Sequence, residues 1–318
     1  MPLPTDEKVL SLSHKILEQF DAVFGYHPGF RPAHAKGALV TGTFTPSPQA
    51  ASLTMAPHIQ RPSTLVTVRF SDSPGIPNIP DNIPDAFPNG MAIRFNLAEH
   101  SHTDIVAHSA DAFPARSGEE FLQFLTAVAT SDRSAPSDPK KPKPVEKFLG
   151  THPATLAYIQ VPKPPPTSFA RQSYFAVSAY KFSSAAGAAR YGRYRIVPSL
   201  GNEYLEPAAA RAKGPNYLFD DLKERLARAA IEFRIMLQLA NEGDITNDAT
   251  VRWPADREVI EFGKLVMDKS VANDAVEQKQ IIFDPIPRVP GIDASADPLL
   301  ELRASDYLMS GRRRRAAK

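Results

Sequence analysis

The chain has 318 residues, no cysteine, and 37 Lys plus Arg against 35 Asp plus Glu, which gives a formal net charge of +2. This length is sufficient to bury a core that needs no disulfide and to enclose a sizeable prosthetic group. The near balance of charge argues against a nucleic-acid partner. The absence of cysteine excludes disulfides, zinc–thiolate sites, iron–sulfur clusters and thiol-based peroxide chemistry.

The N-terminus does not resemble a secretion signal, because Met1 is followed by prolines and a charged amphipathic segment. Apolar residues at helical spacing predict a helix over residues 6–20. No apolar run approaches membrane-spanning length. We therefore expect a cytoplasmic protein without a membrane partner.

Four short segments rich in β-forming residues follow, at residues 38–44, 64–71, 91–97 and 103–107, bounded by Gly or Pro. They predict successive strands of an antiparallel sheet. Ser117 and Glu120 have the spacing of a capping box, so a helix is expected to start there. A second helix is expected over residues 145–160, interrupted at Pro153.

The C-terminal half returns to the strand pattern at residues 174–182, 190–197, 231–239 and 259–267, with a helix near residues 217–226. Strands on both sides of helical connections predict an α+β fold. We expect an antiparallel β-barrel of about eight strands, wrapped by helices and long proline-rich connections, with residues 1–318 as one domain. A second interpretation treats residues 134–144, rich in Pro, Lys and Ser, as a linker between two domains.

Arg303 and Tyr307 form the most informative pair, because residues four apart lie on the same face of a helix. A guanidinium beside a phenol favours the phenolate, which is a hard anionic ligand for ferric iron and serves as the axial ligand in one class of haem proteins. Tyr307 is therefore a candidate metal ligand, with a solvated arginine and phenol as the alternative.

His34 is the second candidate, three residues after Arg31 and just before a predicted strand. Alone it would more often be a structural histidine at a strand edge. Ser71 ends the next predicted strand, and its hydroxyl is able to fix the tautomer and ring angle of a catalytic imidazole.

Together these segments resemble the haem catalases, in particular the small catalase-related peroxidases that keep only the barrel core. The matching motifs are Arg31-x-x-His34-Ala-Lys-Gly37, Val68-Arg69-Phe70-Ser71, Asp104-Ile-Val106, Trp253-Pro254, Phe283-Asp-Pro285 with Val289-Pro-Gly-Ile292, and Arg303-x-x-x-Tyr307. They follow the family's order at similar spacing over nearly the whole chain. Each motif alone is weak evidence for the family. The resemblance is specific because all the motifs occur in the family's order and at similar spacing.

The resemblance implies a haem, haem b with ferric iron, whose proximal ligand is Tyr307, kept as phenolate by Arg303. It implies that His34 moves a proton between the two peroxide oxygens. Further residues are expected to bind the haem: Arg31, Arg69 and Arg314 as contacts of the propionates, Ser71 beside the distal histidine, and Phe121 near the haem plane. Arg314 lies eleven residues after Arg303, which places it on the same helix face.

Three positions depart from the family pattern. His108 stands where large catalases have an asparagine that helps to hold peroxide; it can donate a hydrogen bond but can also titrate. Ala33 replaces a valine that narrows the approach to the haem, so a wider pocket is expected to admit organic hydroperoxides or reducing substrates. Asp306, beside the expected ligand, is expected to point to solvent.

These features favour a haem peroxidase that reduces hydrogen peroxide and organic hydroperoxides with a small-molecule electron donor and has weak catalase activity. A lipid hydroperoxide isomerase or dehydratase is one alternative, and a non-enzymatic haem-binding protein is another. A zinc site made of His100, His102 and His108 is a further, weaker idea. The short chain favours a monomer or a homodimer.

Overall fold

The computed structural model describes residues 4–132, 134 and 136–317. Its helices, in chain order, are α1 (Glu7–Phe24), α2 (Pro48–Leu53), α3 (Gly118–Ala129), α4 (Pro144–Thr151), α5 (Pro153–Gln160), α6 (Pro207–Arg211), α7 (Tyr217–Arg228), α8 (Asp274–Gln280) and α9 (Pro298–Ala316). The strands are β1 (Gly37–Pro46), β2 (Thr64–Ser71), β3 (Gly90–Ala98), β4 (Ser101–His108), β5 (Tyr174–Phe175), β6 (Tyr180–Ser183), β7 (Ala189–Pro198), β8 (Ile231–Leu239), β9 (Val259–Ser270) and β10 (Ile292–Ala294).

Eight of these strands close into an antiparallel barrel. They follow the order β7-β5-β4-β3-β2-β1-β9-β8, and the pairing of β7 with β8 closes the ring. The expected α+β fold with an eight-stranded barrel is therefore confirmed. Full closure leaves no unpaired edge among these eight strands, and β6 and β10 extend the sheet beside β7.

One predicted strand is divided in the structure. Residues 174–182 were expected to form a single strand, but they form β5 and β6, separated by the irregular segment 176–179. Phe175 of β5 pairs with His108 of β4, whereas β6 pairs with β10 and β7. Only Tyr174 and Phe175 of this segment therefore belong to the barrel wall. The residues after 179 form β6, which lies beside β7 outside the closed ring.

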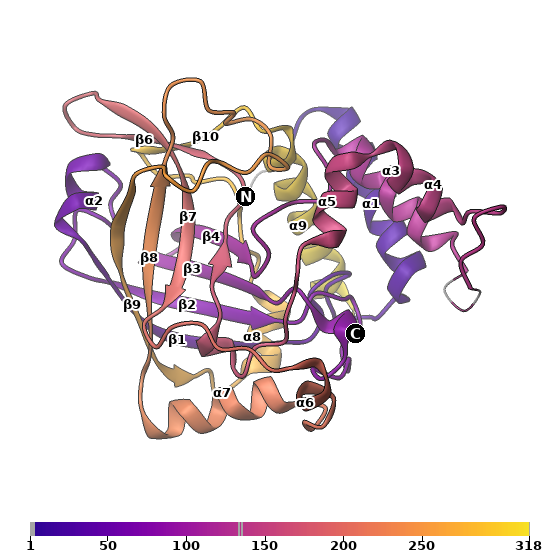
Figure 1. The fold of residues 1–318 in the computed structure, drawn as a ribbon. Helices are drawn as coiled ribbons and strands as arrows, with labels where there is room; N and C mark the ends of the chain where they lie inside the picture. The colour runs from indigo at the N-terminus through magenta and orange to yellow at the C-terminus, as the bar shows by residue number, and fades with distance from the viewer. Residues whose placement is uncertain (1–3, 133, 135, 318) are drawn as a thin grey trace.

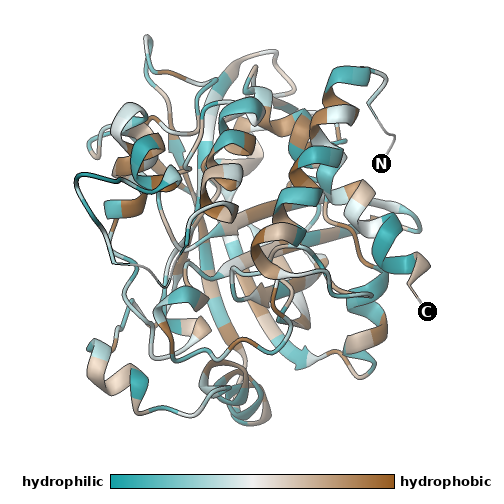
Figure 2. Ribbon diagram, turned by 90° about the vertical axis from the view of Figure 1, so that its right-hand side faces the viewer, coloured by the Kyte–Doolittle hydropathy of each residue, from teal (hydrophilic) through white to brown (hydrophobic). Residues whose placement is uncertain are grey.

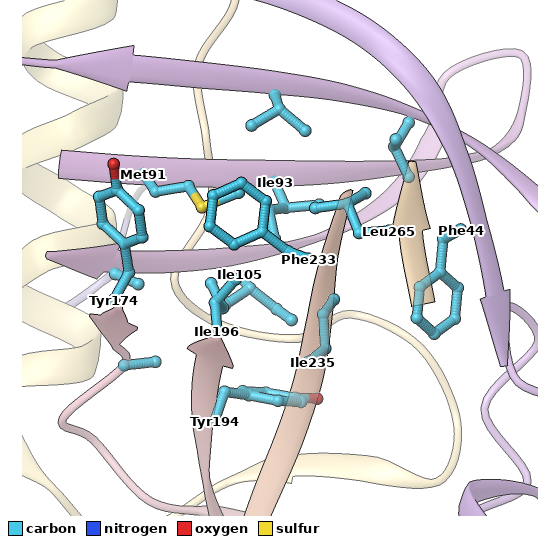
Figure 3. Packing of buried hydrophobic residues seen from close by; sticks show 14 of the residues in the cluster. Phe44, Met91, Ile93, Ile105, Tyr174, Tyr194, Ile196, Phe233, Ile235 and Leu265 are labelled. Atoms are coloured by element: carbon cyan, nitrogen blue, oxygen red, sulfur yellow. The ribbon is translucent and has the colours of Figure 1, made fainter. Parts of the chain in front are cut away.

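The barrel interior is filled by side chains that alternate along the strands. In β3, for example, Met91, Ile93 and Phe95 are buried. Figure 3 shows this packing, with side chains from β3, β4, β7, β8 and β9 pointing toward one another. A filled interior means that any large ligand must bind outside the barrel wall.

Helices α1, α3, α4, α5 and α9 gather on one side of the barrel, whereas α6 and α7 lie at its base (Figure 1). The ribbons of these helices carry both hydrophobic and hydrophilic residues (Figure 2). Phe20 of α1 meets Phe121 of α3 with ring centroids 5.9 Å apart, and Arg313 of α9 forms a bidentate ion pair with Asp21 of α1 at 2.6 and 3.0 Å. These contacts join α1, α3 and α9 into one layer.

Residues 134–144 connect two helices of that layer. The rings of Phe124 in α3 and Phe148 in α4 lie 5.8 Å apart, and the barrel wall continues from β4 to β5 across this stretch. A single domain over residues 1–318 stays our prediction. Among the described helices, none combines the length and apolar character that a membrane span requires.

Candidate active site

A cavity of about 330 Å³ lies between the barrel wall and the layer of helices. All nine predicted site residues line it: Arg31, His34, Arg69, Ser71, His108, Phe121, Arg303, Tyr307 and Arg314. The structure therefore brings together residues from both ends of the chain. Their individual roles stay predictions.

Tyr307 and Arg303 occupy one face of α9. This helix begins after Asp297, whose side chain accepts a hydrogen bond from the backbone N–H of Leu299, with Pro298 at the first helical position. A guanidinium N–H of Arg303 donates to the Tyr307 hydroxyl oxygen at 3.3 Å. Burial lowers the pKa of Arg303, but the nearby phenols of Tyr307 and Tyr180 outweigh this and raise it. Arg303 thus stays cationic beside the phenol oxygen.

His34 is held by a constrained loop on the opposite side. Its backbone has φ of 58°, in the left-handed region that non-glycine residues seldom adopt, and its N–H donates to the carbonyl of Ser73 at 2.8 Å. The ring Nδ1 lies 3.1 Å from Oγ of Ser71. Burial, followed by the charges of Arg69 and Arg31, lowers the pKa of His34 to about 4. The imidazole is therefore neutral near pH 7.

Gly90 makes the His34–Ser71 contact possible. It lies in β3, paired with Ser71 of β2 on one side and with His108 of β4 on the other. A Cβ at this position would be 2.7 Å from Oγ of Ser71 and 2.8 Å from Nδ1 of His34. Only glycine leaves space for that pair.

His108 is fixed as one neutral tautomer. The backbone N–H of Ala110 donates to Nδ1 of His108 at 3.3 Å, so in the neutral ring the proton must lie on Nε2. Burial, with Arg303 and His34 as further causes, lowers the pKa of His108 to about 3. In this neutral ring Nε2–H is a hydrogen-bond donor.

Arg31, Arg69 and Arg314 form a cationic cluster at one end of the cavity. Their partners are backbone carbonyls of residues 34–35 and 278–281 and the side chain of Gln278, and none of them pairs with a carboxylate among residues 4–132, 134 and 136–317. Burial lowers all three pKa values, that of Arg69 to about 9 and that of Arg314 to about 10, and mutual repulsion adds to the effect at Arg31 and Arg69. Asp274 partly offsets the charge at Arg31 and Arg69, and an anionic ligand would offset it further.

The other arginines of the C-terminal run have different surroundings. Arg314 is 3% exposed, whereas Arg312 and Arg315 are exposed and Arg313 pairs with Asp21. Arg314 lies in the cavity wall, and its role as a contact of a haem propionate stays a prediction. Its eleven-residue separation from Arg303 amounts to about three helical turns.

The expectation that Asp306 points to solvent is wrong. Asp306 is 8% exposed and lines the cavity, because α1 packs over this face of α9 and brings Ser13 beside the carboxylate. Burial raises the pKa of Asp306 to about 7, against the opposing effects of Ser13 and Arg303. The sequence pattern alone did not reveal that α1 covers this face.

The three histidines of the zinc idea do not come together as a site. His100 is exposed and His102 lies beside Asp104, whereas His108 lines the cavity. The described residues contain no group of three or more His, Asp or Glu side chains able to hold a metal ion. The zinc idea is therefore wrong for this part of the chain.

Two features of the site were missed from the sequence. Tyr158 of α5 and the apolar side chains Leu17, Phe20 and Phe24 of α1 also line the cavity. Asn89 is fully buried and makes hydrogen bonds to two segments beside the cavity. Its side-chain amide donates to the carboxylate of Asp72 at 2.9 Å, and its backbone N–H donates to Oγ of Ser109 at 3.0 Å. It thereby links the strand end after Ser71 to the loop after His108. No local sequence signal marks these residues, because each acts through contacts with distant segments.

Known proteins similar to this chain point to one family. The catalase family model matches residues 28–318. A catalase-related peroxidase of Mycolicibacterium paratuberculosis is 32% identical over 289 residues, which cover 90% of this chain and 89% of that protein. A catalase-related peroxidase of Synechococcus elongatus is 27% identical over 296 residues, covering 93% and 86% respectively.

Solved structures agree in fold. A fungal catalase superimposes with a TM-score of 0.79 at 23% identity, and catalase A from Saccharomyces cerevisiae with 0.78 at 22%. Each comparison covers 98% of this chain but only 63% and 65% of those longer chains. The match to the family model and the 32% identity show that the chain belongs to the catalase family of oxidoreductases that act on peroxide.

Proposed function

We propose that this protein is a haem-dependent peroxidase that reduces hydrogen peroxide and organic hydroperoxides with an external electron donor and has weak catalase activity. One observation carries the proposal. His34 from the N-terminal loop and Tyr307 from α9 line the same cavity as the buried Arg69 and Arg314 and the half-buried Arg31, which form no ion pair with a carboxylate in the described part of the chain. A dianionic, redox-active cofactor fits this set of groups.

The residues present fit haem b with ferric iron. Arg31, Arg69 and Arg314 would hold the propionates, since a planar guanidinium pairs well with a carboxylate and the cluster needs compensating negative charge. Tyr307 would ligate the iron through its phenol oxygen, to which Arg303 donates a hydrogen bond. When bound, the haem supplies the redox centre that exchanges electrons with peroxide and donor.

The chain itself supplies the proton transfers. With the proton of the neutral ring on Nδ1, His34 would donate to Oγ of Ser71 across their 3.1 Å contact, and the unprotonated Nε2 would take a proton from one peroxide oxygen. Returning that proton to the other oxygen lets it leave as water. His108 stays neutral and presents Nε2–H, which holds peroxide by donating a hydrogen bond. Because both imidazoles are held in place, less translational and rotational entropy is lost when peroxide and the catalytic groups reach the reactive arrangement.

Two positions favour peroxidase over catalase chemistry. Ala33 lines the cavity, and its single methyl group leaves more room above the site than a valine would. The His108 ring is bulkier than an asparagine amide and offers one donor where the amide offers two. We infer that disproportionation of two peroxide molecules is weak and that larger hydroperoxides gain access.

The partners follow from the same site. We propose a peroxide substrate and a small-molecule donor, with the chain acting as a monomer or a homodimer. Purified protein loaded with haem should show a Soret band and peroxide-dependent oxidation of guaiacol. The rate of oxygen release, measured in parallel, gives the fraction of peroxide that is consumed by catalase activity. A protein that takes up no haem would refute the proposal.

His34→Ala is the decisive variant. General acid–base catalysis typically contributes about 10²–10⁴-fold, so guaiacol oxidation should fall by at least about 10²-fold while haem is retained. His14→Ala on exposed α1 surface is the matched control and should keep wild-type activity. Undiminished turnover in His34→Ala would show that another group moves the proton. Conversion of a lipid hydroperoxide without any donor would instead favour an isomerase.

A further inference from the structure

A buried group of charged side chains adjoins the N-terminal loop of the site. Lys36 extends from this loop, and its ammonium donates a hydrogen bond to Asp81. It also donates to the carbonyls of Ile79 at 2.7 Å and Pro215 at 3.2 Å. Oδ2 of Asp72 lies 4.0 Å from the same ammonium, and both aspartate side chains are fully buried. Two carboxyl groups thus share one ammonium away from solvent.

Asp72 is the protonated member of this pair of carboxyl groups. Its Oδ1 accepts a hydrogen bond from Asn89 at 2.9 Å, whereas its Oδ2 is buried and has no hydrogen-bond partner among the described residues. Asp81 already accepts hydrogen bonds from Lys36 and, at 2.9 Å, from the backbone N–H of Leu218. Burial, followed by the charge of Asp81, raises the pKa of Asp72 to about 9. Near pH 7 the Asp72 carboxyl is therefore neutral and able to donate a hydrogen bond to the Asp81 carboxylate.

The ionisable groups that face Asp72 come from several segments of the chain. They are Lys36 before β1, Arg69 of β2, Asp81 after β2, Tyr174 of β5 and Tyr217 of α7. Burial raises the pKa of both phenols, so they stay neutral. Burial also lowers the pKa of Arg69 to about 9, so this group and Asp72 both change charge in the alkaline range.

The residues next to Asp72 hold His34 directly. Oγ of Ser71 contacts Nδ1 of His34 at 3.1 Å, and the carbonyl of Ser73 accepts from the backbone N–H of His34 at 2.8 Å. The backbone N–H of Asp72 itself donates to the carbonyl of Lys36 at 3.2 Å. The two segments are thus joined through their backbones and through the buried charges, so a displacement of the Asp72 side chain would move the imidazole.

We propose that Asp72 is a positioning residue, which holds His34 in place by acting as an uncharged hydrogen-bond donor to Asp81. The inference rests on the proposed peroxidase function, since it concerns the group that moves the peroxide proton. Asp72 is not among the residues that line the cavity, so it acts through its neighbours and not on substrate. An ionised Asp72 would place a second buried negative charge beside Asp81 and compete for the ammonium of Lys36.

Two substitutions in the haem-loaded protein distinguish an uncharged donor from an ionised carboxylate. Asp72→Asn keeps an N–H donor toward Asp81 and an oxygen that accepts from Asn89, so guaiacol oxidation at pH 7 should stay close to the wild-type rate. Asp72→Ala removes both groups, and a displacement of His34 on the order of 1 Å should slow the reaction by about 10- to 100-fold. Asp85→Asn, at an exposed aspartate of the same loop, is the matched control.

The pH profile is a second test, which needs only the asparagine variant. As the pH rises through about 9, Asp72 loses its proton in the wild type. Relative to pH 7, the wild-type rate should therefore fall more steeply than that of Asp72→Asn. Arg69 would produce the opposite difference, because the charge of Asp72 raises its pKa and the variant lacks that charge. This comparison decides the proposal even where Asp72→Ala does not fold.

Cyanide binding separates this inference from the proposed function. Hydrogen cyanide loses a proton when it binds ferric haem as cyanide, so its association rate reports on a positioned base without any turnover. Slower association in Asp72→Ala but not in Asp72→Asn, in a protein that oxidises no guaiacol, would refute the peroxidase function and uphold the role of Asp72. Equal losses in the two variants, or pH profiles of one shape in wild type and Asp72→Asn, would overturn that role.

Discussion

Replacing Gly90 by alanine should disable the distal side of the site while leaving the barrel folded. The added Cβ would lie 2.7 Å from Oγ of Ser71 and 2.8 Å from Nδ1 of His34, whereas ordinary contact begins at 3.4 Å. The two side chains must therefore move by roughly 0.6 Å or more, on the order of the 1 Å misplacement that costs about 10²-fold in rate. Overpacking at this buried position should cost about 1–3 kcal/mol of stability.

The assay is peroxide-dependent guaiacol oxidation by the haem-loaded variant, with haem content measured from its absorption spectrum. We expect a 10- to 100-fold slower reaction at unchanged haem content. Gly150→Ala is the matched control, because a Cβ there meets nothing within 4 Å. Wild-type turnover by Gly90→Ala with full haem content would refute the role assigned to the His34–Ser71 contact.

Two further predictions concern pH and the proximal side. Burial lowers the pKa of His58 to about 3. Between pH 3 and about pH 6.5, the unfolded chain therefore binds more protons at this residue than the folded chain does. The free energy of unfolding consequently decreases as the pH falls through this range. Urea unfolding of the haem-free protein should show a drop between pH 7 and pH 5 that is about 2 kcal/mol larger in wild type than in His58→Leu; equal drops would contradict this. Tyr307→Phe keeps the ring but removes the oxygen that accepts from Arg303, so we expect a folded protein with reduced haem retention and a shifted absorption spectrum. A spectrum identical to wild type would exclude Tyr307 as the ligand.

The sequence alone predicted those contacts that join residues close together along the chain. Arg303 and Tyr307 are four residues apart on one helix, so helical periodicity alone predicts that they meet, and their 3.3 Å hydrogen bond agrees. The same holds for most strands, whose β-branched and aromatic runs predict their position within a few residues. The motif order from Arg31 to Tyr307 further predicted the family, because shared register over the whole chain is specific.

The tertiary structure decided what depends on contacts between distant segments. Arg31 and Arg314 both donate to the carbonyl of Ile281, and only this convergence shows a buried cationic cluster. Asp306 is buried because α1 covers α9, and Tyr158 reaches the cavity because Thr155 ties α5 to the carbonyl of Pro114. Local sequence patterns report on one face of one element, whereas burial depends on which other element covers that face. For this reason the sequence alone predicted the family and the nine residues that line the cavity, and the packing of α1 and α5 determined which further side chains surround them.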